Sequence, residues 1–322
     1  MYQKNYENLV KLVEEDGVII PVAQHRKADG SIDVEKNLNL WNTALKRFDI
    51  INLWPKNQTP GYDDRAPLQS EPSIIFIPAQ NTVEKKGTII VACGGGFVTR
   101  TGCEGFNVAK YFSDKGFNTA ILTYRLFPYS RKDSLNDMQR AIRLLRSKKD
   151  LLDITDKVVC MGFSAGGMLS ANCATHFDYG SSEAEDIIER ESCRPDAVVL
   201  GYGAFCFSAL PASGFISPFS DDIKGPFGCN SRDELVYFSP EVNITRETPP
   251  FFIWQTNSDD PRHSFTMGSA LTAVGIPFEM HLFPEGVHGL ALADGHNDLG
   301  MNISSVHQWA QLCVNWLVSQ KI

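Results

Sequence analysis

The chain has 322 residues, 43% of them hydrophobic and 21% charged, which is enough apolar sequence to bury a core and excludes a disordered or low-complexity protein. The formal net charge of −8 disfavours the basic surface with which proteins usually meet nucleic acid or an anionic membrane. No apolar run approaches the roughly 18 residues of a spanning helix, and residues 1–8 lack the apolar segment of a signal peptide. We therefore expect a cytoplasmic protein without nucleic-acid or membrane partners.

The first 71 residues contain a predicted helix at 5–15 and a Trp- and Pro-rich segment around Trp54 and Pro60, and we expect an N-terminal extension packed on the core. From residue 72 onward, short β-branched runs alternate with amphipathic segments, which predicts an α/β domain over 72–322. Strands are predicted at 73–77, 88–93, 118–124, 157–163, 197–202, 251–255 and 278–283, and covering helices at 133–148 and 304–318. This pattern is typical of a mostly parallel central sheet with helices on both faces.

A serine motif follows the predicted strand 157–163. Gly162-Phe163-Ser164-Ala165-Gly166 lies where this strand turns into a helix-compatible segment, which is the setting of a nucleophile elbow. The flanking glycines suit a sharp turn that leaves no room for Cβ atoms. The alternative is a glycine-rich turn that carries an ordinary serine.

A serine nucleophile needs a base and a carboxylate that orients it, and both follow strand ends downstream. Asp259 and Asp260 come after the strand 251–255, and His288 comes after the strand 278–283, between two glycines. The order Ser, Asp, His is that of α/β-hydrolases. Position alone leaves both aspartates open. His296 is the rival for the base, and it is disfavoured because it lies further from a strand end.

A glycine run offers donors for a developing oxyanion. Gly94-Gly95-Gly96 ends the predicted strand 88–93, where backbone N–H groups are approachable, and the N–H of Ala165 follows the candidate nucleophile. The alternative of a phosphate-binding loop is disfavoured, because no Gly-Lys-Ser/Thr follows and the dinucleotide spacing is incomplete. The eight cysteines form no Cys-x-x-Cys pair, so we expect reduced thiols, no metal site and no cofactor.

These motifs together resemble the acetyl esterase/lipase family of α/β-hydrolases, and within it the xylan-esterase-like branch. The matching stretches are Gly94 to Phe97, Glu104-Gly105, Tyr124 to Leu126, Asp137 to Arg146, Gly162 to Gly167, Asp259 to Pro261 and Phe283 to Gly289. The resemblance implies the α/β-hydrolase fold, with Ser164 as nucleophile, Asp260 as orienting acid, His288 as base, and Gly95, Gly96 and Ala165 as oxyanion donors. The preference for Asp260 over Asp259 rests mainly on this comparison.

The chain departs from the family pattern at Cys93, Gln255, His263 and Ser264, which puts the identity of the substrate in doubt. The expected function is hydrolysis of short acyl esters, with acetyl groups on small molecules or oligosaccharides as the implied substrates. A serine peptidase or another acyl hydrolase would share these residues, and a non-catalytic binding protein on the same fold is a further alternative. Residues 205–233 are predicted to form a lid, with a plain surface loop as the alternative. The sequence leaves the oligomeric state open.

Overall fold

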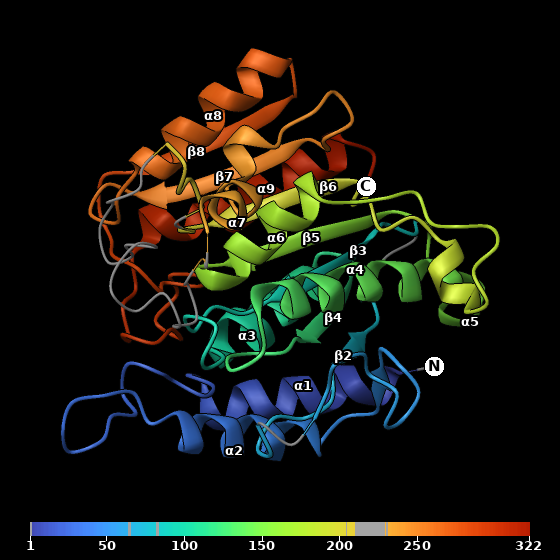
Figure 1. Cartoon of the computed structure of the whole chain (residues 1–322). Coiled ribbons are helices and arrows are strands. Elements are labelled where there is room, and N and C mark those ends of the chain that lie inside the picture. The colour runs from blue at the N-terminus through green and yellow to red at the C-terminus, as the bar shows by residue number, and fades with distance from the viewer. Residues whose placement is uncertain (1, 64–65, 82–83, 204, 210–228, 230) are drawn as a thin grey trace.

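An eight-stranded sheet forms the centre of the protein, as a computed structural model shows (Figure 1). The structure describes residues 2–63, 66–81, 84–203, 205–209, 229 and 231–322. The strand order is β1-β2-β4-β3-β5-β6-β7-β8, with every pair from β4 to β8 parallel and β2 antiparallel to both β1 and β4. The strands are β1 Ile50–Asn52, β2 Ser73–Ile77, β3 Thr88–Ala92, β4 Asn118–Thr123, β5 Val158–Phe163, β6 Ala197–Gly201, β7 Phe251–Thr256 and β8 Phe278–Phe283. The predicted α/β fold with a mostly parallel sheet is confirmed.

Helices cover both faces of this sheet. The α-helices are α1 Gln3–Asp16, α2 Val34–Leu45, α3 Gly102–Asp114, α4 Arg131–Ser147, α5 Lys149–Leu152, α6 Ala165–Thr175, α7 Arg232–Tyr237, α8 Arg262–Val274 and α9 Ser304–Ser319, and Ile187–Arg190 and Pro240–Val242 are short 3-10 turns. Apolar side chains of α4, α6 and α8 pack on one face, and those of α3 and α9 pack on the other, where α1 and α2 extend the layer at the β2 end. Because successive strand residues point to opposite faces, Ile90 and Ala92 join the first core and Ile89 and Val91 the second.

All seven predicted strands are present, with ends that differ by at most one residue. Among the elements that the sequence analysis missed are β1 and α2. A three-residue strand such as β1 is too short to show a period, and its register comes from pairing with β2. Helix α2 had readable signals, because the Asp33 side chain accepts a hydrogen bond from the N–H of Lys36 and the apolar residues Val34, Leu38, Trp41 and Leu45 follow the helical period.

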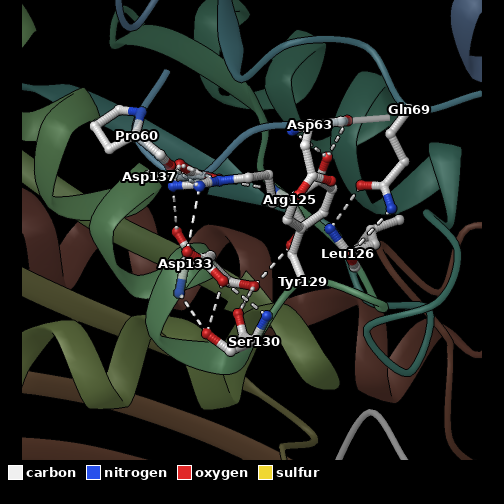
Figure 2. Close-up of polar contacts among 10 residues, drawn as sticks. Pro60, Asp63, Gln69, Arg125, Leu126, Tyr129, Ser130, Asp133 and Asp137 are labelled. Carbon is white, nitrogen blue, oxygen red and sulfur yellow. Dashed lines mark hydrogen bonds and ion pairs between the residues drawn. The ribbon is translucent and has the colours of Figure 1, made fainter. Parts of the chain in front are cut away.

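The first 71 residues join the sheet through β1 and are tied to the start of α4 (Figure 2). The Arg125 side chain donates to the carbonyl of Pro60 at 2.6 Å, and the Tyr129 hydroxyl donates to the carbonyl of Asp63 at 2.8 Å. The Gln69 side chain exchanges two hydrogen bonds with the backbone of Leu126. These contacts fix the extension against the segment that links β4 to α4.

A buried ion pair anchors the same segment. Arg125 and Asp137 are fully buried and form a bidentate pair, with Nη2 of Arg125 2.7 Å from Oδ1 of Asp137, and the N–H of Arg125 donates to the same carboxylate (Figure 2). Burial raises the pKa of Asp137 to about 6 even though Arg125 favours its charged form. Arg140, one turn further along α4 than Asp137, contacts Asp186 and Glu189 instead.

The structure also bears on the cysteines, on membrane-spanning helices and on the predicted lid. All eight cysteines lie among the described residues, and each is a buried thiol outside any disulfide. No helix within the described ranges is both long and apolar enough to cross a bilayer. Of the lid predicted at 205–233, residues 210–228 and 230 lie outside the described part of the chain.

Candidate active site

Ser164 occupies the turn between β5 and α6. Its backbone has φ 52° and ψ −120°, a conformation that costs a non-glycine residue energy and that is characteristic of nucleophile elbows. The turn is closely packed: a Cβ on Gly162 would lie 2.0 Å from the carbonyl oxygen of Gly166, and one on Gly166 would lie 2.1 Å from that of Ala92. Only glycine fits at these two positions, which explains the Gly-x-Ser-x-Gly pattern physically.

His288 lies in the loop after β8 and reaches Ser164. Its Nε2 is 2.7 Å from Oγ of Ser164, within hydrogen-bond distance. The imidazole packs edge-on against the ring of Tyr202, with 5.1 Å between ring centroids, and 37% of the His288 side chain stays exposed. The structure therefore brings together the predicted nucleophile and the predicted base.

The acid that contacts His288 is Asp259, and the prediction of Asp260 for this position is wrong. Nδ1 of His288 is 2.8 Å from Oδ2 of Asp259, whose side chain is 4% exposed. Asp260 has a left-handed backbone with φ 40°, and its carboxylate forms a bidentate pair with Arg262 at 2.6 and 2.7 Å. The two neighbouring carboxylates thus point to different partners, and the pKa of Asp260 is lowered by its hydrogen bonds with Arg262.

Two of the family departures hold the turn that carries Asp259. The Gln255 side chain donates to the carbonyl of Asp259, and it accepts a hydrogen bond from the Ser264 hydroxyl at 2.5 Å. The hydroxyl of Ser258 donates to the carbonyl of Gly286, two residues before His288. The acid turn and the histidine loop are therefore bonded to each other as well as through the Asp259 carboxylate.

The surroundings of His288 favour its charged form. Burial lowers the pKa of the imidazole, but the hydrogen bond with Asp259 and the negative charges of Asp259, Glu104 and Asp298 outweigh burial, so the pKa is raised above its usual value. A base with a raised pKa accepts a proton from a serine more readily, and its conjugate acid is stabilised by the carboxylate behind it.

The glycine loop after β3 lies directly against Ser164. A Cβ on Gly94 would be 2.7 Å from Cβ of Ser164, and the left-handed φ angles of 124° at Gly95 and 64° at Gly96 turn the chain back over the end of the sheet. The N–H of Gly94 donates to Glu104, whereas those of Gly95 and Gly96 donate to no acceptor among the described residues. Ala165 is the first residue of α6, where helix N–H groups lack partners within the helix.

The sequence analysis missed the roles of Glu104, which it quoted only as part of the family resemblance, and of Tyr202; both residues lie beneath these loops. The two oxygens of the buried Glu104 carboxylate accept hydrogen bonds from the N–H of Gly94 and, at 2.9 Å, from the hydroxyl of Tyr202. Burial raises the pKa of Glu104 to about 7, although both hydrogen bonds favour the ionised form. The only signal in the sequence is a glutamate set among small and apolar residues in the first turn of α3.

The other candidates lie apart from this cluster. His296 is half exposed, and its Nδ1 lies 3.9 Å from Oδ2 of Asp294. It makes no hydrogen bond with Ser164. Among the residues that the structure describes, no group of three or more His, Cys, Asp or Glu side chains is arranged to hold a metal ion. The chemistry that the described geometry supports is proton transfer from a serine to a carboxylate-backed histidine.

Known proteins resemble the chain over most of its length. A family model described as BD-FAE matches residues 74–264. An acetyl ester-xyloside bifunctional hydrolase from Caldicellulosiruptor lactoaceticus is 31% identical, with a TM-score of 0.73 over 84% of this chain and 96% of that one. A sugar hydrolase from Lactococcus lactis is 26% identical, with a TM-score of 0.63 over 78% of this chain and 95% of its own. Endo-1,4-beta-xylanase B of Butyrivibrio fibrisolvens is 33% identical over 78% of this chain. The matched part makes up only 39% of that longer relative.

Proposed function

The chain belongs to the BD-FAE family, an esterase family of α/β-hydrolases, and on that premise we propose that it is a serine carboxylic-ester hydrolase for short acyl, chiefly acetyl, esters. The observation that carries the proposal is the continuous chain of hydrogen bonds from Ser164 Oγ to His288 Nε2 and from His288 Nδ1 to Asp259 Oδ2. This is the arrangement in which a serine loses its proton to a histidine held in the correct tautomer.

In the proposed reaction, Ser164 Oγ attacks the ester carbonyl carbon while His288 Nε2 takes the serine proton. Asp259 holds the imidazole and stabilises its positive charge. The N–H groups of Gly95, Gly96 and Ala165 are the proposed donors to the tetrahedral oxyanion. The imidazolium then protonates the leaving alcohol, and a water molecule activated by His288 cleaves the acyl-serine and releases the acid.

The proposed substrates are acetylated small molecules or oligosaccharides. This assignment is supported by the acetyl ester-xyloside bifunctional hydrolase, of which the chain covers 96%, and by the match to a xylanase of which it spans 39%. Ester cleavage by this route needs no cofactor, because the serine, the histidine and the backbone donors supply nucleophile, base and electrostatic stabilisation.

The proposal is tested by hydrolysis of p-nitrophenyl esters from acetate to octanoate. We expect kcat/KM to be highest for acetate or the next longer acyl groups, and Ser164→Ala to abolish turnover. The exposed Ser182, remote in sequence from the elbow and bonded only to Glu183, gives a matched control, because Ser182→Ala removes the same hydroxyl and should leave the rate unchanged. Release of acetate from acetylated xylo-oligosaccharides then tests the alcohol part of the substrate.

Three results would contradict the proposal. Ester turnover that survives Ser164→Ala would remove Ser164 from the reaction. Turnover of p-nitroanilides in preference to esters would indicate a peptidase, which uses the same residues on an amide. A chain that binds acetylated oligosaccharides and cleaves no ester would instead be a binding protein.

A further inference from the structure

We propose that Glu104 is a positioning residue for ester hydrolysis, because its single carboxylate ties the oxyanion loop to the loop that carries His288. The inference rests on the proposed function and assigns a role to a side chain that makes no contact with the reacting atoms. It concerns the two loops that must keep their places beside Ser164 while the oxyanion forms.

The hydrogen bonds run in one continuous path between these loops. Oε2 of Glu104 accepts from the N–H of Gly94, at the start of the oxyanion loop, and Oε1 accepts from the hydroxyl of Tyr202 at 2.9 Å. The oxygen of that hydroxyl accepts in turn from the N–H of Ala291 at 2.9 Å, three residues after His288. The path therefore crosses from the loop after β3 to the loop after β8 through two side chains.

The local chemistry requires a carboxylate in the middle of this path. Gly94 N–H and the Tyr202 hydroxyl are both donors, so the group between them must accept two hydrogen bonds. A carboxylate accepts one on each oxygen, whereas an amide has an acceptor at one end and donors at the other. Glu104 and Tyr202 are each 1% exposed, so water cannot replace either bond. The N-terminus of α3, whose first turn holds Glu104, favours the negative charge.

Helix capping does not explain why a glutamate stands in the first turn of α3. In a capping box the glutamate of the first turn bonds back to the N-cap residue, but here the Thr101 side chain makes no capping bond and the Glu104 carboxylate points to Gly94 and Tyr202. A Cβ on Gly94 would lie 2.7 Å from both Glu104 Oε2 and Ser164 Cβ, so the carboxylate sits immediately behind the nucleophile.

One end of the path lies at strained backbone, and the other lies next to a left-handed glycine. Gly95 has φ 124°, and Ala291, a residue with a Cβ, has φ 47°. Between them, the ring of Tyr202 packs edge-on against the imidazole of His288. Loss of the carboxylate would release the N–H of Gly94 and the hydroxyl of Tyr202 together, and both loops would relax away from Ser164.

The test compares Glu104→Gln, Tyr202→Phe and the double variant, with kcat expressed per active site titrated with diethyl p-nitrophenyl phosphate. We expect Glu104→Gln to lower kcat by about 10- to 100-fold and Tyr202→Phe by about 3- to 10-fold, with KM for p-nitrophenyl acetate within about threefold in both. The double variant should match Glu104→Gln, because residues that act through one chain of bonds are not additive.

The matched control is Tyr6→Phe. The Tyr6 hydroxyl also donates to a carboxylate, that of Asp114 at 2.6 Å, but this hydrogen bond links α1 to α3. We expect this variant to keep the wild-type kcat, so that a general effect of losing a tyrosine–carboxylate bond is separated from an effect on the site. Since a purely structural role would lower the fraction of titratable protein and the melting temperature, a fall in kcat per active site at unchanged KM identifies positioning.

A folded Glu104→Gln variant with kcat within about twofold of wild type would overturn the proposal, as would effects of the two substitutions that multiply. If Glu104→Gln does not fold, Tyr202→Phe alone decides, because an unchanged kcat there breaks the path. The rate of phosphorylation of Ser164 by the same reagent gives a parallel comparison that needs no ester turnover. A wild-type protein that is phosphorylated but cleaves no ester would contradict the proposed function while leaving the Glu104 comparison intact, and one that does neither would contradict both.

Discussion

Asp259→Asn should lower kcat by orders of magnitude more than Asp260→Asn does. Asp259 accepts from Nδ1 of His288 at 2.8 Å with 4% of its side chain exposed, whereas Asp260 pairs with Arg262, whose side chain is 58% exposed. An asparagine at 259 can present its NH₂ to Nδ1, which would put the imidazole proton on Nε2 and leave no acceptor for the serine proton.

The expected size follows from triads in which this exchange has been made. In serine proteases the same substitution lowers kcat by about 10⁴, which corresponds to about 5 kcal/mol of transition-state stabilisation. We expect Asp259→Asn to lower kcat by about 10²- to 10⁴-fold. Asp260→Asn removes a partly exposed ion pair worth about 0–1 kcal/mol of stability and should leave kcat within about threefold of wild type.

The assay is turnover of p-nitrophenyl acetate per titrated active site, with melting temperatures to show that both variants fold. Each variant loses one negative charge at adjacent positions, so either serves as the control for the other. A large loss in Asp260→Asn together with a small loss in Asp259→Asn would refute the geometric assignment and restore the assignment that the family resemblance implied.

Three further predictions follow from named contacts. The pKa of His288 is raised above its usual value and the base must be neutral, so kcat/KM should rise with pH through that raised pKa; Asp259→Asn should move the acidic limb to lower pH, and an unmoved limb would remove Asp259 from the titrating pair. Asp137→Ala leaves the buried Arg125 guanidinium without its main partner and should lower the free energy of unfolding by about 3–5 kcal/mol in urea denaturation, whereas a loss below about 1 kcal/mol would mean that the pair is dispensable. Gly162→Ala places a Cβ 2.0 Å from the Gly166 carbonyl and should abolish activity or folding, while Gly167→Ala, with its nearest atom at 3.2 Å, should be tolerated; equal effects, measured by activity and thermal melting, would contradict this packing.

Most of the sheet was predictable because its strands are continuous apolar runs that break at polar or glycine residues. Parallel strands buried on both faces must read this way, and the loops after β5, β7 and β8 must then meet at one edge of the sheet. That geometry places Ser164 and His288 together from sequence alone, and the close packing at Gly162 and Gly166 gives the glycine pattern its physical meaning.

The choice between Asp259 and Asp260 was not predictable from position, because adjacent residues share a loop and differ only in backbone dihedral angles. The left-handed conformation at Asp260 and the hydrogen bonds of Gln255 decide which carboxylate faces His288. Glu104 was missed for a related reason. Its partners, Gly94 and Tyr202, are 10 and 98 residues away, and no local period reports such contacts.

The central claim is that Ser164 is the nucleophile and His288 its base, and stoichiometric phosphorylation tests it most directly. In the reaction with diethyl p-nitrophenyl phosphate, a bond forms between Ser164 Oγ and phosphorus, the bond to nitrophenolate breaks, and His288 receives the serine proton. We expect one nitrophenolate to be released per chain, with the diethylphosphoryl group on the peptide that contains Ser164. Ester turnover should be lost in parallel, and Ser164→Ala and His288→Ala should not be labelled. An adduct on another residue, or esterase activity that survives complete labelling of Ser164, would contradict it.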